Sequence, residues 1–404
     1  MHGRVNPRRE VTGRAPCAAN GNGDTTRSHP APVRILIAPD KFKGSLSAPA
    51  AAEAIARGLR TVWPDAQFDL SPIADGGEGF AESLAAALGA EWVKVASEDA
   101  IGRSIEARYA WLPGEHLAIL EMSEASGLHR IALHERAPLR ADTFGTGLLI
   151  AHAIARGAKR ILVGLGGSAT TDGGAGMARA LGFRFLDRDG RELSTTPEKL
   201  ASLAHIEPPM TLRLPEIFAA CDVQNPLLGE RGAARVYGPQ KGADASAVEM
   251  LEGILSRLAT RCAADLGCDH RDVSGAGAAG GLGFGLLTFC GAKIRPGFDM
   301  IAETLHLGDR IAAADLVITG EGRIDDQTLD GKGPAGVAAL ARQAGKPVIG
   351  FGGSITATAE DAGIFDALIP IADRPLDISE AMRDAASLLE RASRRAAQLI
   401  GMRP

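Results

Sequence analysis

One pattern recurs along the chain and restricts its fold: an apolar strand-like run, a glycine-rich loop with acidic or hydroxyl side chains, and then a helical stretch. This strand-to-helix alternation predicts parallel sheets with helices on both faces, an α/β architecture. Ligands on such sheets bind at the carboxyl ends of the strands, where the loops gather. The pattern covers residues 33–62, 68–90, 158–182 and 314–345 and, more loosely, 216–238.

The alternation breaks in the middle of the chain. Residues 91–99, 104–112 and 116–124 are three successive strand-like segments without helices between them. A chain of 404 residues is long enough for two or three domains with buried cores. We therefore expect a second, mixed α/β domain in this region.

Charge and hydropathy exclude several classes of partner. The formal net charge of -5 provides no attraction for nucleic acid or an anionic membrane. No apolar run approaches the ~20 residues that a membrane span needs.

The five cysteines lack metal-ligand spacing and are interpreted as reduced thiols of a cytoplasmic protein. Residues 1–32 are arginine-rich without an apolar segment, which predicts a disordered extension.

Familiar nucleotide and hydrolase motifs fail on their context. Residues 275–280 match G-x-G-x-x-G, but the residues before them form a poor strand. The chain has no G-x-x-x-x-G-K-[ST] loop, and its double glycines followed by serine lack the last glycine of a nucleophile elbow. A P-loop enzyme and a serine hydrolase are therefore excluded.

Two acidic or basic loops follow the first strand-like runs. The stretch APDKFKGSLSA places Lys41 and Lys43 between a strand and a helix, where they suit a phosphate or a carboxylate. A solvated turn is the alternative. The stretch IADGGEG places Asp75 among glycines that allow close backbone approach to a ligand.

The loop GGSATTDGG resembles a dinucleotide turn but carries Ser168, Thr170, Thr171 and Asp172. An ordinary dinucleotide turn needs none of these side chains. A carboxylate at a bare helix N-terminus repels phosphate unless a cation lies between them. Asp172 therefore indicates Mg²⁺ binding or proton abstraction.

The stretch TGEGRIDDQTLDGKGP combines several carboxylates with Arg323 and Lys332 directly after a strand. Carboxylates beside basic side chains can hold Mg²⁺ and nucleotide phosphates, and an exposed salt-bridged loop is the alternative. The loops together contain no nucleophile with an attendant base. Phosphoryl transfer needs none, because it depends on positioning, cations and one base.

Six stretches resemble the bacterial glycerate kinase family of type 1, in matching order from about residue 33 to residue 401. They are ILIAPDKFKGSLSA, PIADGGEGF, GLGGSATTDGGAGMARALG, CDVQNPLLGERGAARVYGPQKGA, GAGAAGGLGFGLL and DLVITGEGRIDDQTLDGKGP.

The resemblance implies ATP-dependent phosphorylation of D-glycerate, most often at the 2-hydroxyl, with Mg²⁺. It also implies two α/β domains: a Rossmann-like domain formed from both chain ends, and a mixed domain inserted in it. We place the first at residues 33–74 and 291–404, and the second at residues 75–290. No nucleic-acid or membrane partner is expected, and a homo-oligomer is left open.

Site roles follow from the resemblance together with the chemistry of each side chain. Asp172 is the first candidate for the base that takes the hydroxyl proton, and Asp75 is the second. The candidate substrate contacts are Lys41, Lys43, Ser168, Thr170, Thr171 and Arg323. Asp222 and Glu321 are the candidate metal ligands, and Asn225, Lys241 and Lys332 the candidate nucleotide contacts.

Three alternatives remain at this point. The first is a glycerate 3-kinase with the same fold. The second is an NAD(P)-dependent oxidoreductase that uses residues 164–187, with Asp187 on the ribose. The third is a nucleotide sensor without activity, which would have no need of Asp75 and Asp172.

Overall fold

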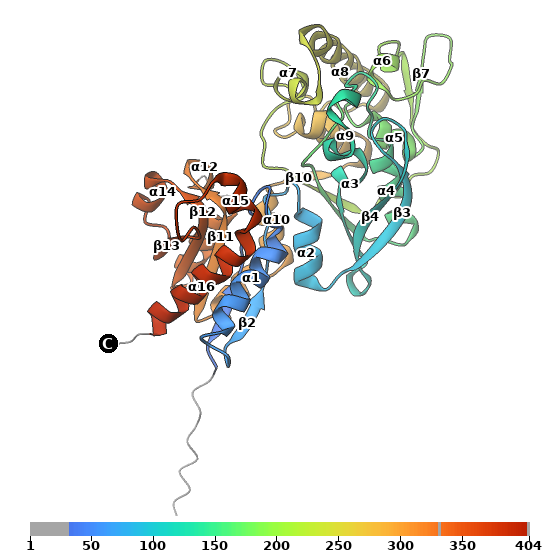
Figure 1. Ribbon diagram of the computed structural model, residues 1–404. Coiled ribbons are helices and arrows are strands. Elements are labelled where there is room, and N and C mark those ends of the chain that lie inside the picture. The colour runs from blue at the N-terminus through green and yellow to red at the C-terminus, as the bar shows by residue number, and fades with distance from the viewer. Residues whose placement is uncertain (1–31, 330–332, 402–404) are drawn as a thin grey trace, which may run out of the picture. The chain divides into compact units, whose positions relative to one another are not determined.

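The parallel sheet of this protein combines strands from both ends of the chain. The computed structural model describes residues 32–329 and 333–401, and Figure 1 shows their arrangement into helices and strands. The five strands are all parallel and follow the spatial order β13 (Ala367–Pro370), β12 (Val348–Ile355), β11 (Leu316–Ile324), β1 (Arg34–Ile37) and β2 (Gln67–Leu70).

The second sheet is mixed, as the break in the alternation predicts. Its first strands along the chain pair in antiparallel fashion and the others in parallel fashion. The spatial order is β10 (Lys293–Arg295), β9 (Glu216–Ala220), β6 (Arg160–Gly164), β5 (Leu117–Glu121), β4 (Ser104–Leu112) and β3 (Glu91–Glu98). A separate antiparallel pair is formed by β7 (Arg184–Leu186) and β8 (His205–Glu207).

These sheets confirm the predicted fold class, with a parallel sheet from both chain ends and a mixed α/β region between them. The division into two domains and its boundaries stay predictions. Strand β10 falls inside the range expected for the Rossmann-like domain, yet it pairs with β9 of the mixed sheet. The extension expected at residues 1–32 lies outside the described residues, apart from Pro32.

Helices cover both faces of the parallel sheet. On one face α1 (Ala48–Arg60) and α16 (Ala385–Gly401) share a buried cluster with β1, β11 and β12. The other face packs against α10 (Gly297–Thr304), α11 (Leu307–Ala313) and α13 (Pro334–Gln343). This second cluster also contains α2 (Phe80–Leu88) and side chains of the mixed sheet.

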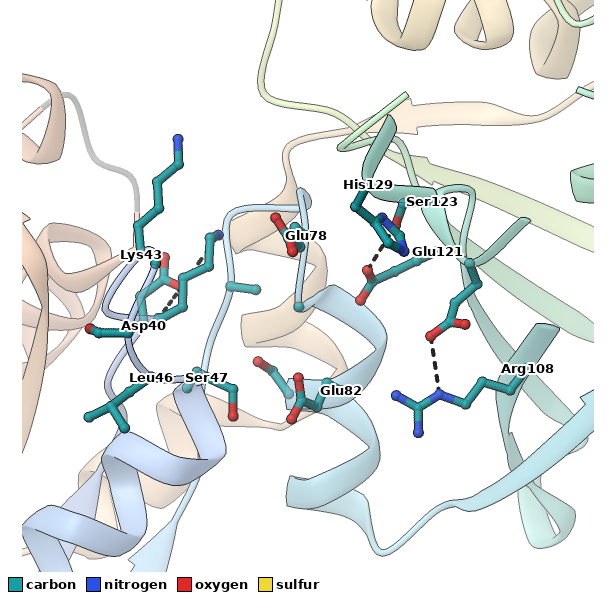
Figure 2. A pocket seen from close by; sticks show the side chains of 18 of the residues that line it. Asp40, Lys43, Leu46, Ser47, Glu78, Glu82, Arg108, Glu121, Ser123 and His129 are labelled. Carbon is teal, nitrogen blue, oxygen red and sulfur yellow. Dashed lines mark hydrogen bonds and ion pairs between the residues drawn. The ribbon is translucent and has the colours of Figure 1, made fainter. Parts of the chain in front are cut away.

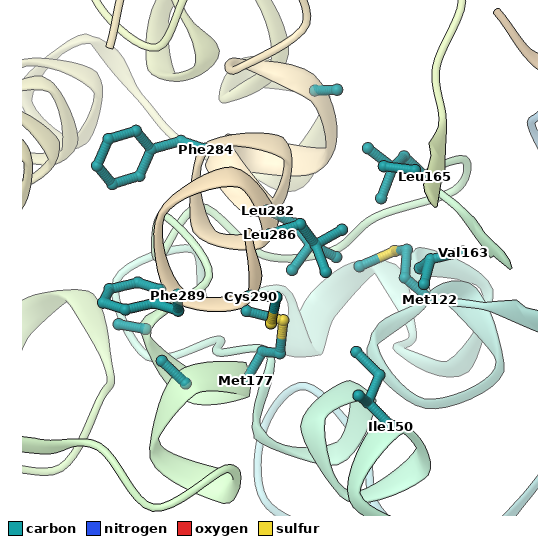
Figure 3. Close-up of a cluster of buried hydrophobic side chains, with 14 of the residues drawn as sticks. Met122, Ile150, Val163, Leu165, Met177, Leu282, Phe284, Leu286, Phe289 and Cys290 are labelled. Carbon is teal, nitrogen blue, oxygen red and sulfur yellow. The ribbon is translucent and has the colours of Figure 1, made fainter. Parts of the chain in front are cut away.

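The largest cluster lies on the mixed sheet and its helices (Figure 3). Phe284 and Leu286 of α9 (Ala278–Cys290) are fully buried there, together with Met177 of α5 (Ala175–Ala180). Burial of one such side chain stabilises the fold by roughly 1.5–3 kcal/mol. The cluster also includes α4 (Phe144–Ala155), α7 (Ala233–Tyr237) and α8 (Ala245–Leu266).

The first helix and the last two helices begin and end at identifiable residues. Ser47 is the N-cap of α1, with Pro49 in the first turn, and its hydroxyl accepts a hydrogen bond from the Ala50 N–H. The helical region near the C-terminus is divided into two helices. The chain leaves helical geometry at Asp384, where ψ is 8°, so α15 (Ile378–Arg383) ends before α16 begins.

The remaining helices are short. They are α3 (Ser123–Ser126), α6 (Pro197–Leu200), α12 (Asp326–Leu329) and α14 (Ala357–Asp361), with single 3₁₀ turns at Pro113–Glu115, Leu128–Arg130, Leu133–Glu135 and Pro239–Lys241. Within residues 32–329 and 333–401, every helix is too short or too polar to span a bilayer.

Candidate active site

The loops that follow β1, β2 and β11 meet at one end of the parallel sheet. Strand β1 lies between β11 and β2, so the three loops leave the sheet side by side. Asp40 donates its backbone N–H to the carbonyl of Gly320 at 2.8 Å, and Ile73 donates to Pro39 at 2.9 Å. These bonds tie the loop after β1 to strand β11 and to the loop after β2.

Three cavities adjoin these loops and share Lys41 and Lys43 among their lining residues. Their volumes are about 380, 650 and 460 Å³. We name them the first, second and third cavity in that order. The two lysines predicted as substrate contacts therefore lie at the junction of the three cavities.

Lys41 and Asp75 form an ion pair at this junction. The Lys41 ammonium lies 3.2 Å from Asp75 Oδ1 and 3.9 Å from Asp40 Oδ1. Burial opposes ionisation of Asp75, but Lys41 and a hydrogen bond from the Gly77 N–H outweigh it and lower the pKa of Asp75. Burial likewise opposes the charge on Lys41, yet Asp40 and Asp75 together raise its pKa. Both groups are charged at neutral pH.

The second cavity contains carboxylates from the end of β11 and from the turn that follows it. Glu321 Oε1 accepts a hydrogen bond from Thr328 Oγ1 at 2.7 Å, and Arg323 pairs with Asp325 at 2.9 Å. Burial and the charges of Asp40, Asp325 and Asp75 raise the pKa of Glu321 to about 7. This crowding of carboxylates favours a bound cation.

Asp40 and Asp222 extend the same acidic region. Asp40 is 5% exposed, and burial together with the charges of Asp75 and Asp222 raises its pKa to about 6. Asp222 lines the third cavity and accepts the Gly297 N–H at 2.9 Å. Among the described residues, no three carboxylate, histidine or cysteine side chains form a complete metal site. The donor set fits Mg²⁺, which typically takes one or two carboxylates and completes its shell with water and substrate phosphates.

The third cavity brings Lys41 and Asp75 together with Ser168 and Lys241. Ser168 is 8% exposed, and its hydroxyl donates to the carbonyl of Ala279 at 3.2 Å. Gly166 also lines this cavity, and a Cβ there would lie 2.5 Å from Gly77 Cα. Only glycine lets the two loops approach this closely.

Asp172, the first candidate for the base, is enclosed in the fold. Its side chain is fully buried and lines none of these three cavities. Its Oδ2 accepts hydrogen bonds from the Thr143 N–H at 2.9 Å, the Thr143 hydroxyl at 2.7 Å and the Gly176 N–H at 2.9 Å. The structure thus places Asp172 at the starts of α4 and α5, where it holds buried donors.

Several other candidates are also placed away from the cavities. Thr170 and Thr171 are fully buried and line none of the three cavities, although the Thr170 carbonyl accepts from Lys241. The Asn225 amide donates to the Arg231 carbonyl and accepts from the Tyr237 hydroxyl, which holds its own loop. Lys332 lies outside the described residues.

Comparisons with known proteins agree on one family. The model of the glycerate kinase family matches residues 35–401. The chain belongs to the glycerate kinase family. It is therefore a kinase.

Similar proteins cover almost the whole chain. A glycerate kinase of Halalkalibacterium halodurans is 44% identical over 89% of this chain and 96% of its own length. The glycerate 2-kinase of Escherichia coli is 42% identical over 92% of this chain and 99% of its own length. A crystal structure assigned as glycerate kinase 2 of Salmonella typhimurium LT2 aligns with a TM-score of 0.83 at 42% identity, and covers 92% of this chain and 98% of that one.

The first cavity of this glycerate kinase contains residues that sequence reasoning did not assign to a site. Figure 2 shows Glu78, Glu121, Ser123 and His129 around it, opposite Asp40 and Lys43. Glu121 is 8% exposed, and its Oε1 accepts the Ala81 N–H at 2.7 Å. The sequence feature that could have indicated Glu121 is its place as an acid at the carboxyl end of the apolar run LAILE. Its contact with α2 cannot be inferred from the sequence.

The dinucleotide alternative is wrong for this kinase. A dinucleotide fold needs a parallel strand after the glycine loop and its helix, with the ribose acid at the end of that strand. Here β7 follows α5 and pairs with β8 in antiparallel fashion, in a two-stranded sheet separate from the parallel strands. Asp187 after β7 instead accepts the N–H groups of Asp189 and Arg191 in an exposed turn.

Proposed function

We propose that this glycerate kinase transfers the γ-phosphoryl group of ATP to the 2-hydroxyl of D-glycerate, giving 2-phosphoglycerate and ADP. The observation that carries the proposal is the Lys41–Asp75 pair, which lines both the second and the third cavity. The second cavity offers carboxylates and Arg323 for a magnesium nucleotide, and the third offers Ser168 and Lys241 for a small hydroxy acid. The name of the similar Escherichia coli protein, a glycerate 2-kinase, supports the choice of hydroxyl.

The two members of the pair have different roles in this proposal. The hydroxyl oxygen of glycerate attacks the γ-phosphorus while the bond from that phosphorus to the β,γ-bridging oxygen breaks, and ADP leaves. Asp75 accepts the hydroxyl proton, because it is ionised and half-buried at the junction of the cavities. The Lys41 ammonium, 3.2 Å from Asp75, stabilises negative charge on the transferred group.

The surrounding side chains bind and orient the nucleotide. Glu321 and Asp40, which line the second cavity, would hold Mg²⁺, which when bound neutralises phosphate charge, whereas Asp222 lines the third cavity. Arg323 at the rim of the second cavity contacts the nucleotide phosphates, and exposed Lys43 attracts both anionic substrates.

A product assay tests this function on the purified chain. We expect ADP release that requires ATP, Mg²⁺ and D-glycerate together, with a product that enolase consumes directly. Enolase acts on 2-phosphoglycerate, whereas 3-phosphoglycerate must first pass through a mutase. Consumption only after mutase is added would indicate a 3-kinase, and no ADP release would contradict the proposal as a whole.

The magnesium requirement should depend on pH. The pKa values of Asp40 and Glu321 are raised to about 6 and about 7, so both carboxyls gain protons as the pH falls from 7.5 to 5.5. A cation must displace these protons. We therefore expect the Mg²⁺ concentration for half-maximal turnover to rise roughly tenfold or more over this interval.

The matched variant for this measurement is Glu321→Gln, which keeps the size of the side chain and removes its ionisation. It should need more Mg²⁺ at pH 7.5 and show a smaller change between pH 7.5 and 5.5. A Mg²⁺ requirement that is independent of pH in the natural protein would remove both carboxyls from the metal site.

A further inference from the structure

We infer that Lys241 is the anchor for the carboxylate of the hydroxy-acid substrate, rather than a nucleotide contact, and that it sets the preference for an anionic substrate. The inference rests on the proposed function and names the subsite that distinguishes glycerate from uncharged polyols. It concerns the wall of the third cavity formed by Lys241, Ser168 and Ala279.

Lys241 is a lysine enclosed in the protein. Its side chain is 2% exposed, and the residue ends the 3₁₀ turn Pro239–Lys241. The Lys241 N–H donates to the Gly238 carbonyl at 2.9 Å, and Gly242 with φ of 95° closes the turn. Such backbone bonds fix where the side chain enters the cavity wall.

The ammonium has polar neighbours but no carboxylate in contact. Its Nζ donates to the Thr170 carbonyl at 2.5 Å and lies 3.4 Å from Ser168 Oγ. Among the residues the structure describes, no ion pair within 4.0 Å involves Lys241. An ammonium has three N–H donors, so one remains for a ligand.

Burying an ammonium without a carboxylate in contact disfavours its charged form, and this lowers its pKa. Burial lowers the pKa of Lys241 to about 7, and the charge of Asp172 only partly opposes this effect. An anion in the cavity would restore the charged form. The site is therefore suited to a ligand with one negative charge.

The rest of this wall fits a carboxylate better than a polyphosphate. It includes the apolar Leu165, Ala278 and Ala279 and the Ser168 hydroxyl, with Tyr237 and Gln240 also lining the cavity. One ammonium and one hydroxyl match one carboxylate. Lys41 and Lys43 line both cavities, whereas Arg323 and Glu321, which suit a magnesium triphosphate, line the second cavity.

Lys241→Met tests the inference, because methionine has a similar length and no charge. We expect the KM for D-glycerate to rise roughly 30-fold or more, the typical effect of losing a hydrogen bond to a charged group. The KM for ATP should change less than about threefold. Inhibition by D-glyceramide, which lacks the carboxylate charge, should also change less than about threefold.

Two further outcomes would overturn the inference. An increase in the KM for ATP as large as that for glycerate would place Lys241 on the nucleotide. Equal weakening of glycerate and glyceramide would make its role structural. Lys241→Gln, which can still donate to the Thr170 carbonyl, is the second variant should the methionine variant not fold, and the same split is expected for it.

The proposed function and this inference fail in different ways. If the natural protein does not phosphorylate D-glycerate, the function is wrong before any variant is made. If it does, and Lys241→Met retains the natural KM for glycerate, only the carboxylate anchor is wrong.

Discussion

Asp75→Asn is expected to lower kcat at least ~10²-fold without weakening the binding of ATP. Asparagine keeps the shape of the side chain and can still accept the hydrogen bond from the Gly77 N–H. It cannot take a proton, and it removes the charge that faces Lys41 at 3.2 Å. The measurement combines turnover in the enolase-coupled assay with a calorimetric titration of ATP.

Glu78→Gln is the matched control for this prediction. Glu78 is an exposed acid three residues further along the same loop, and its charge also acts on Lys41. If proton transfer is the role of Asp75, the control retains turnover within about threefold. A loss of less than about tenfold in Asp75→Asn, or equal losses in both variants, would remove Asp75 from the role of base.

The sequence predicts the part of the site that depends on the order of strands and loops, namely the convergence of Lys41, Asp75 and Glu321. Lys41 and Asp75 follow β1 and β2, Glu321 lies near the carboxyl end of β11, and the carboxyl ends of parallel strands meet at one edge of a sheet. Their convergence therefore follows from the strand–loop–helix pattern alone. The side chains that contact Lys41 agree with this expectation, since two of them are Asp40 and Asp75.

The sequence could not predict which side chains of these loops are buried. Asp172 lies on a glycine-rich loop that suggests an open site, but its partner Thr143 comes from another element, 29 residues earlier. The loop is also covered by the start of α9, where a Cβ on Gly280 would lie 1.8 Å from the Thr170 carbonyl oxygen. Whether an acid on such a loop faces a ligand or a buried donor depends on these distant contacts.

The same limit applies to Asn225 and to the first cavity. Asn225 follows β9 in the way that Asp75 follows β2, yet its amide bonds to the Tyr237 hydroxyl and the Arg231 carbonyl. Glu121 reaches the Ala81 N–H, 40 residues away in the chain. Strand-end position thus predicts which loops form a site, whereas side-chain partners decide which residues of those loops are available.

Asp172→Ala is expected to destabilise the protein strongly. Alanine leaves the N–H groups of Thr143 and Gly176 buried without an acceptor, and removes the partner of the Thr143 hydroxyl. Each of the two N–H groups left without an acceptor costs about 1–3 kcal/mol, so the free energy of unfolding should fall by roughly 2–6 kcal/mol. Denaturant unfolding followed by circular dichroism measures this change.

Asp172→Asn separates this structural role from catalysis. Its carboxamide oxygen can occupy the position of Oδ2 and accept the same three hydrogen bonds. Burial raises the pKa of Asp172 from 3.8 to about 6, so between these values the folded protein binds more protons than the unfolded chain and loses stability as the pH rises. The neutral amide avoids that loss at pH 7. Asparagine should therefore keep the fold and retain turnover within about tenfold, whereas a loss of ~10²-fold in a stably folded variant would return the role of base to Asp172.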